Sequence, residues 1–257
     1  MRKIFISLFL AGTVSVGGLR SDAEANEGGL ALGTGVVSPA ASVRIQLNPA
    51  AAFDLGTLLH TGARYDVVGG GPLAGVGVTR ANPSSAWVFG GGGEWNVLTQ
   101  NPEVGFGLGF RPMTAHALGA SASVRKTSSG KQLSFGIFEH SVWSAGLETA
   151  FSVSNVSGGL ETADVSGGIL LNSLIGAGSR FEFDLTYLFS AADLHLSPAV
   201  FVPIYSGFGA LVGAEVPLNA SRGYVSTAGL SYEAPSWSLS LRGSTRINAD
   251  LAFAYRY

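Results

Sequence analysis

Apolar and polar side chains alternate strictly along much of this chain. The clearest alternating segments are 103–111, 180–189, 236–244 and 249–257. In the second of these, Phe181, Phe183 and Leu185 alternate with Glu182 and Asp184. Successive side chains of a strand point to opposite faces, so a period of two predicts β-strands that each have one apolar and one polar face.

The strands that this pattern predicts have the length needed to cross a bilayer at a tilt. Aromatic residues stand near their ends, as in an interfacial girdle: Trp143, Tyr224, Tyr232, Trp237 and Tyr257. The opposite face is rich in Gly, Ser and Ala with scattered charges, which suits a wet or plugged lumen. A soluble sandwich would also alternate. The aromatic ends and the polar face favour an all-β, transmembrane antiparallel barrel, and such a sheet must close because an unpaired edge cannot face lipid.

Turn-forming residues divide the chain from residue 57 onward into fourteen predicted strands, an even number as expected for a single-chain bacterial barrel. They are predicted at 57–67, 73–81, 85–96, 103–111, 117–126, 131–139, 143–153, 163–173, 179–189, 195–205, 207–217, 224–233, 236–244 and 249–257. Pro198 and Pro203 fall inside a predicted strand, where proline is unfavourable. Merging the strands of 131–153 or of 195–217 gives twelve as the alternative count.

The N-terminus has the features of a secretory signal peptide. A basic start at Arg2 and Lys3 precedes an apolar run, and Ala23-Glu24-Ala25 offers a cleavage site. A membrane anchor is the alternative, but Ser, Thr and Gly residues interrupt the run. The predicted organisation is a signal peptide at 1–25, a non-alternating segment at 26–56, and a barrel at 57–257, exported to a bacterial outer membrane.

Composition excludes several classes of protein. Charged residues make up 12% of the chain and apolar residues 46%, which is too apolar for a disordered protein. The formal net charge of −2 provides no basic excess for binding nucleic acid. The absence of cysteine excludes a disulfide scaffold, a thiolate metal site and a catalytic cysteine.

The segment before the first predicted strand contains the small-residue run Ala41-Ser42 and then Asn48-Pro49-Ala50. In this it resembles the FadL family of outer-membrane channels for long-chain fatty acids, whose members carry a small-residue run followed by an Asn-Pro-Ala-Gly-Leu motif. Ala51-Ala52 stand where Gly-Leu is usual. The resemblance implies a fourteen-stranded barrel whose lumen is closed by a plug at 26–56, with Asn48, Pro49 and Ala50 as the plug motif.

The same resemblance implies passive uptake of hydrophobic compounds such as long-chain fatty acids, which leave through a gap at a kinked third strand. Gly90, Gly91, Gly92 and Gly93 lie in the predicted third strand and are candidates for this lateral gate. They could instead make room for the plug, since glycine lets another backbone approach closely. The expected partners are outer-membrane lipid, hydrophobic small molecules and the barrel-assembly machinery, the last through the C-terminal strand ending at Tyr257. Long capture loops are missing from the pattern, so the family's hydrophobic groove is not expected.

Several charged residues are predicted to face the lumen. They are Arg64, Asp66, Arg111, Arg125, Glu148, Arg180, Glu182, Asp184, Glu215, Arg242 and Arg256. Arginine binds carboxylates through two parallel hydrogen bonds, so Arg64, Arg111 and Arg125 are candidate contacts for a substrate head group. Ion pairs along the wall, or contacts with the plug, are the alternative role.

Catalysis is not expected. The four histidines are His60, His116, His140 and His195, and none lies in a nucleophile motif or in a metal-ligand spacing. No cofactor or metal is predicted. Besides the hydrophobic-compound channel, two functions remain open: a narrow porin for small hydrophilic solutes, and a structural or assembly barrel without transport.

Overall fold

The computed structural model describes residues 50, 57–66, 71–81, 85–96, 102–127, 130–218, 224–245 and 248–256. The predicted signal peptide, Asn48, Pro49 and Tyr257 lie outside these residues. The predicted plug also lies outside them, apart from Ala50, which is buried in a turn. None of the helices among the described residues is long and apolar enough to cross a membrane.

The fold consists of strands with two short 3-10 helices, η1 (Leu160–Thr162) and η2 (Phe189–Ala191). The strands are β1 (Thr57–Asp66), β2 (Gly71–Ala81), β3 (Trp87–Asn96), β4 (Pro102–Met113), β5 (His116–Thr127), β6 (Gly130–Ser144), β7 (Leu147–Val156), β8 (Asp164–Asn172), β9 (Arg180–Leu188), β10 (Asp193–Tyr205), β11 (Phe208–Pro217), β12 (Val225–Glu233), β13 (Trp237–Ser244) and β14 (Asn248–Arg256).

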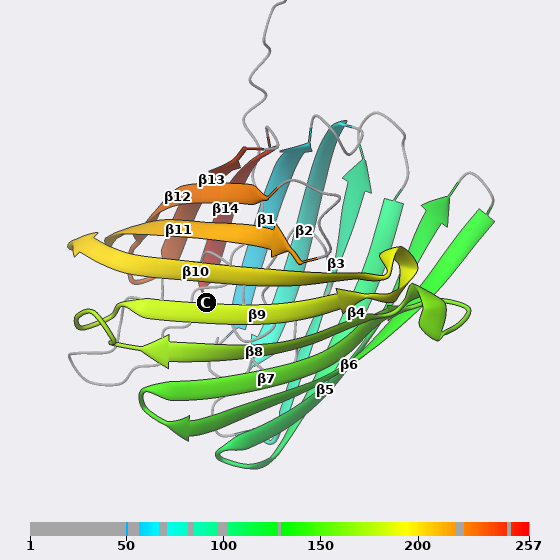
Figure 1. The fold of residues 1–257 in the computed structure, drawn as a ribbon, viewed down its shortest axis with the longest axis horizontal. Helices are drawn as coiled ribbons and strands as arrows, with labels where there is room; N and C mark the ends of the chain where they lie inside the picture. Colours follow the sequence, from blue (N-terminus) through cyan, green and yellow to red (C-terminus); the bar gives the residue numbers. More distant parts are fainter. Residues whose placement is uncertain are drawn as a thin grey trace, which may run out of the picture.

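Each strand pairs in antiparallel fashion with the strands before and after it in the chain. β1 also pairs with β14, with Thr61 opposite Phe253, so the strand order closes on itself. Figure 1 shows this arrangement, in which the last strands of the chain lie beside the first. The predicted all-β, antiparallel architecture is confirmed.

The two faces of the sheet carry the side chains that the alternation predicted. In β4, the side chains of Val104 and Phe106 are 62% and 60% exposed, whereas Glu103, which directly precedes Val104, is buried. In β9, Phe183 is exposed while Glu182 and Asp184 are fully buried. We call the face that bears the exposed apolar side chains the outer face and the opposite one the inner face.

The boundary between β6 and β7 differs most from the sequence prediction. β6 extends to Ser144, so Trp143 lies at the end of this strand and not at the start of the next one. The predicted break between 139 and 143 is therefore wrong, because pairing with β5 continues through His140 and Ser141. β10 accommodates both prolines. Its register with β11 shifts between Pro203 and Tyr205, as expected where a proline cannot donate a ladder hydrogen bond.

The two ends of the closed sheet have different connections. One end carries two-residue turns at 114–115, 145–146 and 206–207 together with the seven-residue connection 173–179, and we call it the short-turn end. The other carries η1 and η2, and we call it the loop end. Connections between successive strands do not exceed seven residues, so the expectation of uniformly short connections is confirmed.

Candidate functional site: the inner face of the closed sheet

The inner face brings charged side chains together across neighbouring strands. Near the loop end, Glu103 on β4 is directly opposite Arg125 on β5. The Arg125 Nε donates a hydrogen bond of 2.6 Å to Oε2 of Glu103, and Nη2 lies 2.5 Å from the same oxygen. The Ser123 hydroxyl donates to Oε1 at 2.9 Å. The buried carboxylate of Glu103 is thus bonded through both oxygens.

A second polar group links β6, β7 and β8 near the short-turn end. Nε2 of His140 lies 2.9 Å from Oε2 of Glu148, and the Asn172 side-chain amide donates to Oε1 at 2.8 Å. These three side chains come from positions far apart in the sequence. Antiparallel register brings them to the same height, because Glu148 pairs with Val142 on one side and Leu170 on the other.

A third polar group lies at the loop end of β10 and β11. His195 is buried, with Nε2 2.9 Å from Oδ2 of Asp193 and Nδ1 2.6 Å from Oε1 of Glu215. The side chain of Glu215 is 40% exposed, which leaves it the most accessible member of the three.

The wall between these groups carries further buried polar side chains on β8, β9 and β10. Glu182 and Asp184 are fully buried, and the hydroxyls of Ser166 and Thr186 are 2.8 Å apart. The guanidinium carbon of Arg180 lies 5.0 Å from the centre of the Phe201 ring, a cation–π distance.

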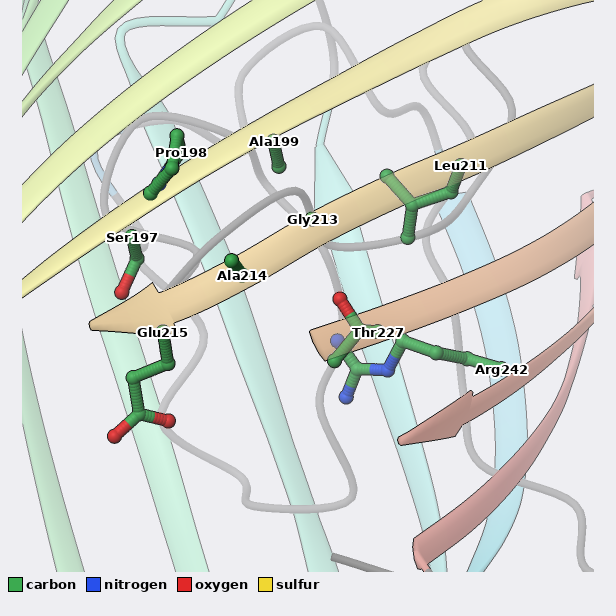
Figure 2. Close-up of a pocket in the computed structure, with 9 residues that line it drawn as sticks. All are labelled: Ser197, Pro198, Ala199, Leu211, Gly213, Ala214, Glu215, Thr227 and Arg242. Atoms are coloured by element: carbon green, nitrogen blue, oxygen red, sulfur yellow. The ribbon is translucent and has the colours of Figure 1, made fainter. Parts of the chain in front are cut away.

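Some inner-face positions are apolar and narrow the interior. A buried cluster consists of Ala150, Leu170, Ala199, Phe201 and Leu211. A cavity of about 40 Å³ lies beside it. Figure 2 shows this cavity between β10, β11, β12 and β13, with Ser197 and Glu215 on one side and Arg242 reaching past Thr227 on the other. This volume admits water.

The structure does not gather the three candidate arginines into one site. Arg125 is paired with Glu103 at the loop end, whereas Arg111 lies near the short-turn end of β4. Arg64 is opposite Asp250 and Leu73 in the β1 ladders, and its side chain lies outside the described set. Binding of a substrate carboxylate by these residues stays a prediction, while the ion-pair role is seen directly for Arg125.

The glycine run lies in β3 and is paired along both edges. Gly90 to Gly93 are opposite Thr79 to Val76 on β2 and opposite Gly107 to Val104 on β4, with no shift of register. No bulge interrupts these ladders at the glycine run. At Gly92, a Cβ would lie 2.5 Å from the Val76 carbonyl oxygen and 2.7 Å from Gly77 Cα, so the close approach of two strands explains this glycine. A lateral gate stays a prediction that requires these ladders to open.

One histidine contacts a serine on the outer face. Nδ1 of His116 lies 2.8 Å from the Ser141 hydroxyl, which donates to Glu139. Ser141 is buried, and its proton is directed to the carboxylate rather than to the imidazole. This order differs from a catalytic triad, in which the acid binds the histidine. Within the described part of the chain, no group of three His, Cys, Asp or Glu side chains could hold a metal ion.

The histidine–carboxylate contacts on the inner face were not predicted. Asp193 and His195 are two residues apart in an alternating segment, which places them on one face and was a usable signal. The contacts with Glu215 and Glu148 depend on the register between strands, which alternation along one strand does not contain.

Comparison with known proteins shows likeness in structure alone. No family model matches the chain, and no curated protein matches it. A variant of the Rhodopseudomonas blastica porin is 9% identical, with a TM-score of 0.49 over 78% of this chain and 98% of that one. The KdgM porin in complex with disordered oligogalacturonate is 9% identical, with a TM-score of 0.44 over 78% of this chain and 99% of that one. At this identity and TM-score the likeness carries no argument about the function of this chain.

Proposed function

We propose that the closed sheet of β1–β14 is a transmembrane barrel of a bacterial outer membrane and a narrow channel for small hydrophilic solutes. The observation that supports this most strongly is the inverted polarity of its two faces. Large apolar side chains are exposed on the outer face, and carboxylates such as Glu182 and Asp184 are buried on the inner face. A soluble barrel would have the opposite arrangement.

The outer face has the distribution of side chains that a bilayer requires. Its middle carries exposed apolar residues such as Phe106, Ile137 and Val212. Exposed aromatic residues lie at the short-turn end, namely Trp87, Phe110, Trp143, Tyr205, Phe208, Trp237 and Tyr255. At the loop end, Trp95, Phe189 and Tyr224 are exposed. Two aromatic girdles that flank an apolar band are typical of transmembrane barrels.

The three two-residue turns at the short-turn end support an orientation, and the connection 173–179 is the one long connection among the described residues at this end. Bacterial barrels place short turns in the periplasm and longer connections outside the cell. The short-turn end is also where β14 ends. We therefore place this end in the periplasm and the loop end, with the His195 group, at the cell surface.

The inner face favours hydrophilic solutes over hydrophobic ones. Besides its charged residues it carries the buried hydroxyls of Ser197, Ser231, Ser238 and Ser240, which have no hydrogen-bond partner among the described residues. An unpaired hydroxyl is costly to bury in an apolar environment, so these positions favour water or a polar solute. The uptake of fatty acids, which the family resemblance implies, has no comparable support on this wall.

The bore of such a channel would be small, because Phe138, Phe201 and Leu211 project from the inner face and are buried. Liposome swelling with sugars of increasing size tests the proposal. We expect a pentose to enter vesicles that contain the protein and a trisaccharide to be excluded. Uptake of a labelled long-chain fatty acid into the same vesicles, with lipopolysaccharide in the outer leaflet to suppress unaided crossing, tests the alternative.

Two neighbouring substitutions provide the matched control. Ser240→Phe adds a ring on the inner face of β13, whereas Leu241→Phe changes the exposed outer face one residue later. We expect the first to slow sugar entry and the second to leave it unchanged. A folded protein that passes neither sugar nor fatty acid would instead support a structural or assembly barrel.

A further inference from the structure

The inner face carries more carboxylates than guanidinium groups. Among the described side chains, those on the inner face include eight acidic residues and four arginines. The acidic residues are Glu103, Glu148, Asp164, Glu182, Asp184, Asp193, Glu215 and Glu233, and the arginines are Arg111, Arg125, Arg180 and Arg242. The formal excess of four negative charges stays negative even if His140 and His195 are both protonated.

This excess is concentrated on one side of the barrel. The strands from β7 to β11 hold six of the eight acidic residues and Arg180 alone among the arginines. Glu182 and Asp184 lie within β9, between the two ends of the barrel. The acidic side therefore extends from Asp193 near the loop end to Glu148 near the short-turn end.

The cavity of Figure 2 borders this acidic side. Glu215 lines it with a side chain that is 40% exposed. Ser197 lines it as well, and its hydroxyl is buried without a hydrogen-bond partner among the described residues. Glu215 and Ser197 thus bring a carboxylate and a hydroxyl oxygen to one wall of the cavity, and Arg242 lies on the opposite wall. Oxygen groups of this kind replace part of the water shell of a cation.

From these observations we propose that the channel selects cations over anions, with Glu215 as the carboxylate that permeating ions meet most directly. The inference rests on the proposed channel function and names its solute class. Negative charge along a narrow, low-dielectric passage concentrates cations and repels anions, and the effect weakens as salt screens the charges.

The test is the reversal potential of the purified full-length protein in a planar bilayer under a tenfold KCl gradient. We expect a potential of the sign that marks K⁺ as more permeant than Cl⁻, with a smaller value as total salt rises. Glu215→Gln should lower the K⁺ to Cl⁻ permeability ratio about twofold, since it removes one accessible negative charge from the passage. Glu161→Gln, the same change in the exposed helix η1, should leave the ratio unaltered.

The other outcomes distinguish a failure of cation selectivity from a failure of the proposed channel function. Conductance without preference, or with preference for Cl⁻, overturns cation selectivity and leaves the channel intact. An unchanged ratio in Glu215→Gln, with the wild type cation-selective, overturns the role of Glu215. A protein that migrates as folded in a heat-modifiability gel but conducts no ions removes the proposed function and the selectivity with it.

Discussion

Arg125 binds Glu103 across the β4–β5 ladder through two guanidinium nitrogens, at 2.6 Å and 2.5 Å from one carboxylate oxygen. The two residues share a register position, and the Glu103 side chain is 4% exposed against 44% for Arg125. A buried carboxylate is therefore held by a cation that is itself half in water. The two partners do not contribute equally, because losing one leaves a buried charge and losing the other does not.

We predict that Arg125→Gln destabilises the barrel more than Glu103→Gln. The first variant leaves the buried Glu103 carboxylate without its cation, and the Ser123 hydroxyl still donates a hydrogen bond to it. We expect this to lower the free energy of unfolding by about 1–3 kcal/mol. The second leaves a neutral amide that can still accept from Ser123. Urea unfolding in lipid vesicles, followed by tryptophan fluorescence, measures both. Lys126→Gln on the exposed next residue is the control. Equal losses in the two variants would contradict the asymmetry.

Adjacent glycines of β3 should respond differently to alanine. A Cβ at Gly92 would lie 2.5 Å from the Val76 carbonyl oxygen on β2, which is shorter than the contacts that Cβ atoms make in proteins. Gly92→Ala must therefore push the two strands apart. At Gly91 the nearest atom is the Gly105 carbonyl oxygen, at an ordinary 3.4 Å. We expect Gly92→Ala to lower the temperature at which heat-modifiable mobility is lost, and Gly91→Ala to leave it unchanged or raise it, since alanine loses less chain entropy. The reverse order would contradict this account of the run.

The ring of Phe201 occupies the space over Gly209 on the neighbouring strand. A Cβ at Gly209 would overlap the ring, which is 1% exposed and has Arg180 near it. Gly209→Ala should therefore cost about 1–3 kcal/mol through overpacking. Gly93→Ala, whose Cβ would have 3.6 Å as its shortest contact, is the matched substitution and should be nearly neutral. Denaturant unfolding of the two variants decides this, and a neutral Gly209→Ala would show that the ring can move aside.

The position of an outer-face residue along its strand should determine how much an introduced charge destabilises the folded barrel in a membrane. Phe106 lies in the middle of β4 and is 60% exposed, whereas Met113 ends the strand and is 65% exposed. If the apolar band lies in lipid, Phe106→Arg costs about 2–4 kcal/mol and Met113→Arg at most about 1 kcal/mol. Folding into vesicles, measured by heat-modifiable mobility, reports both. Equal tolerance at the two positions would argue that the band does not lie in a bilayer.

Alternation along single strands was sufficient to predict which side chains share a face. The prediction assigned Val104 and Phe106 of β4 correctly to the apolar, outer face. It also assigned Glu182 and Asp184 of β9 correctly to the polar, inner face, because a period of two is a local property of the chain. The same alternation, with the aromatic strand ends, was sufficient to predict the antiparallel all-β class.

Contacts between strands could not be predicted in this way. To predict that Glu103 contacts Arg125, or that His195 contacts Glu215, one must know the register between the two strands. A shift of one residue in the register would move the side chains of a strand to the other face of the sheet. The end of β6 was misplaced because Glu139, His140 and Ser141 form a polar run that resembles a connection, whereas the strand continues through them to Ser144. Asn155 has a positive φ of 57° where the register of β6 and β7 shifts, and nothing in the alternation marked this irregularity.

The most direct test of the proposed channel is the reaction of single cysteines with a membrane-impermeant thiol reagent. The chain has no cysteine of its own, so an introduced one is the sole thiol. Thr227 lines the inner cavity on β12, and Ala228 is the next residue, exposed on the outer face. In protein reconstituted into vesicles, we predict that Thr227→Cys reacts and Ala228→Cys is protected by lipid. A reactive Ala228→Cys with an unreactive Thr227→Cys would contradict a water-lined barrel in the membrane.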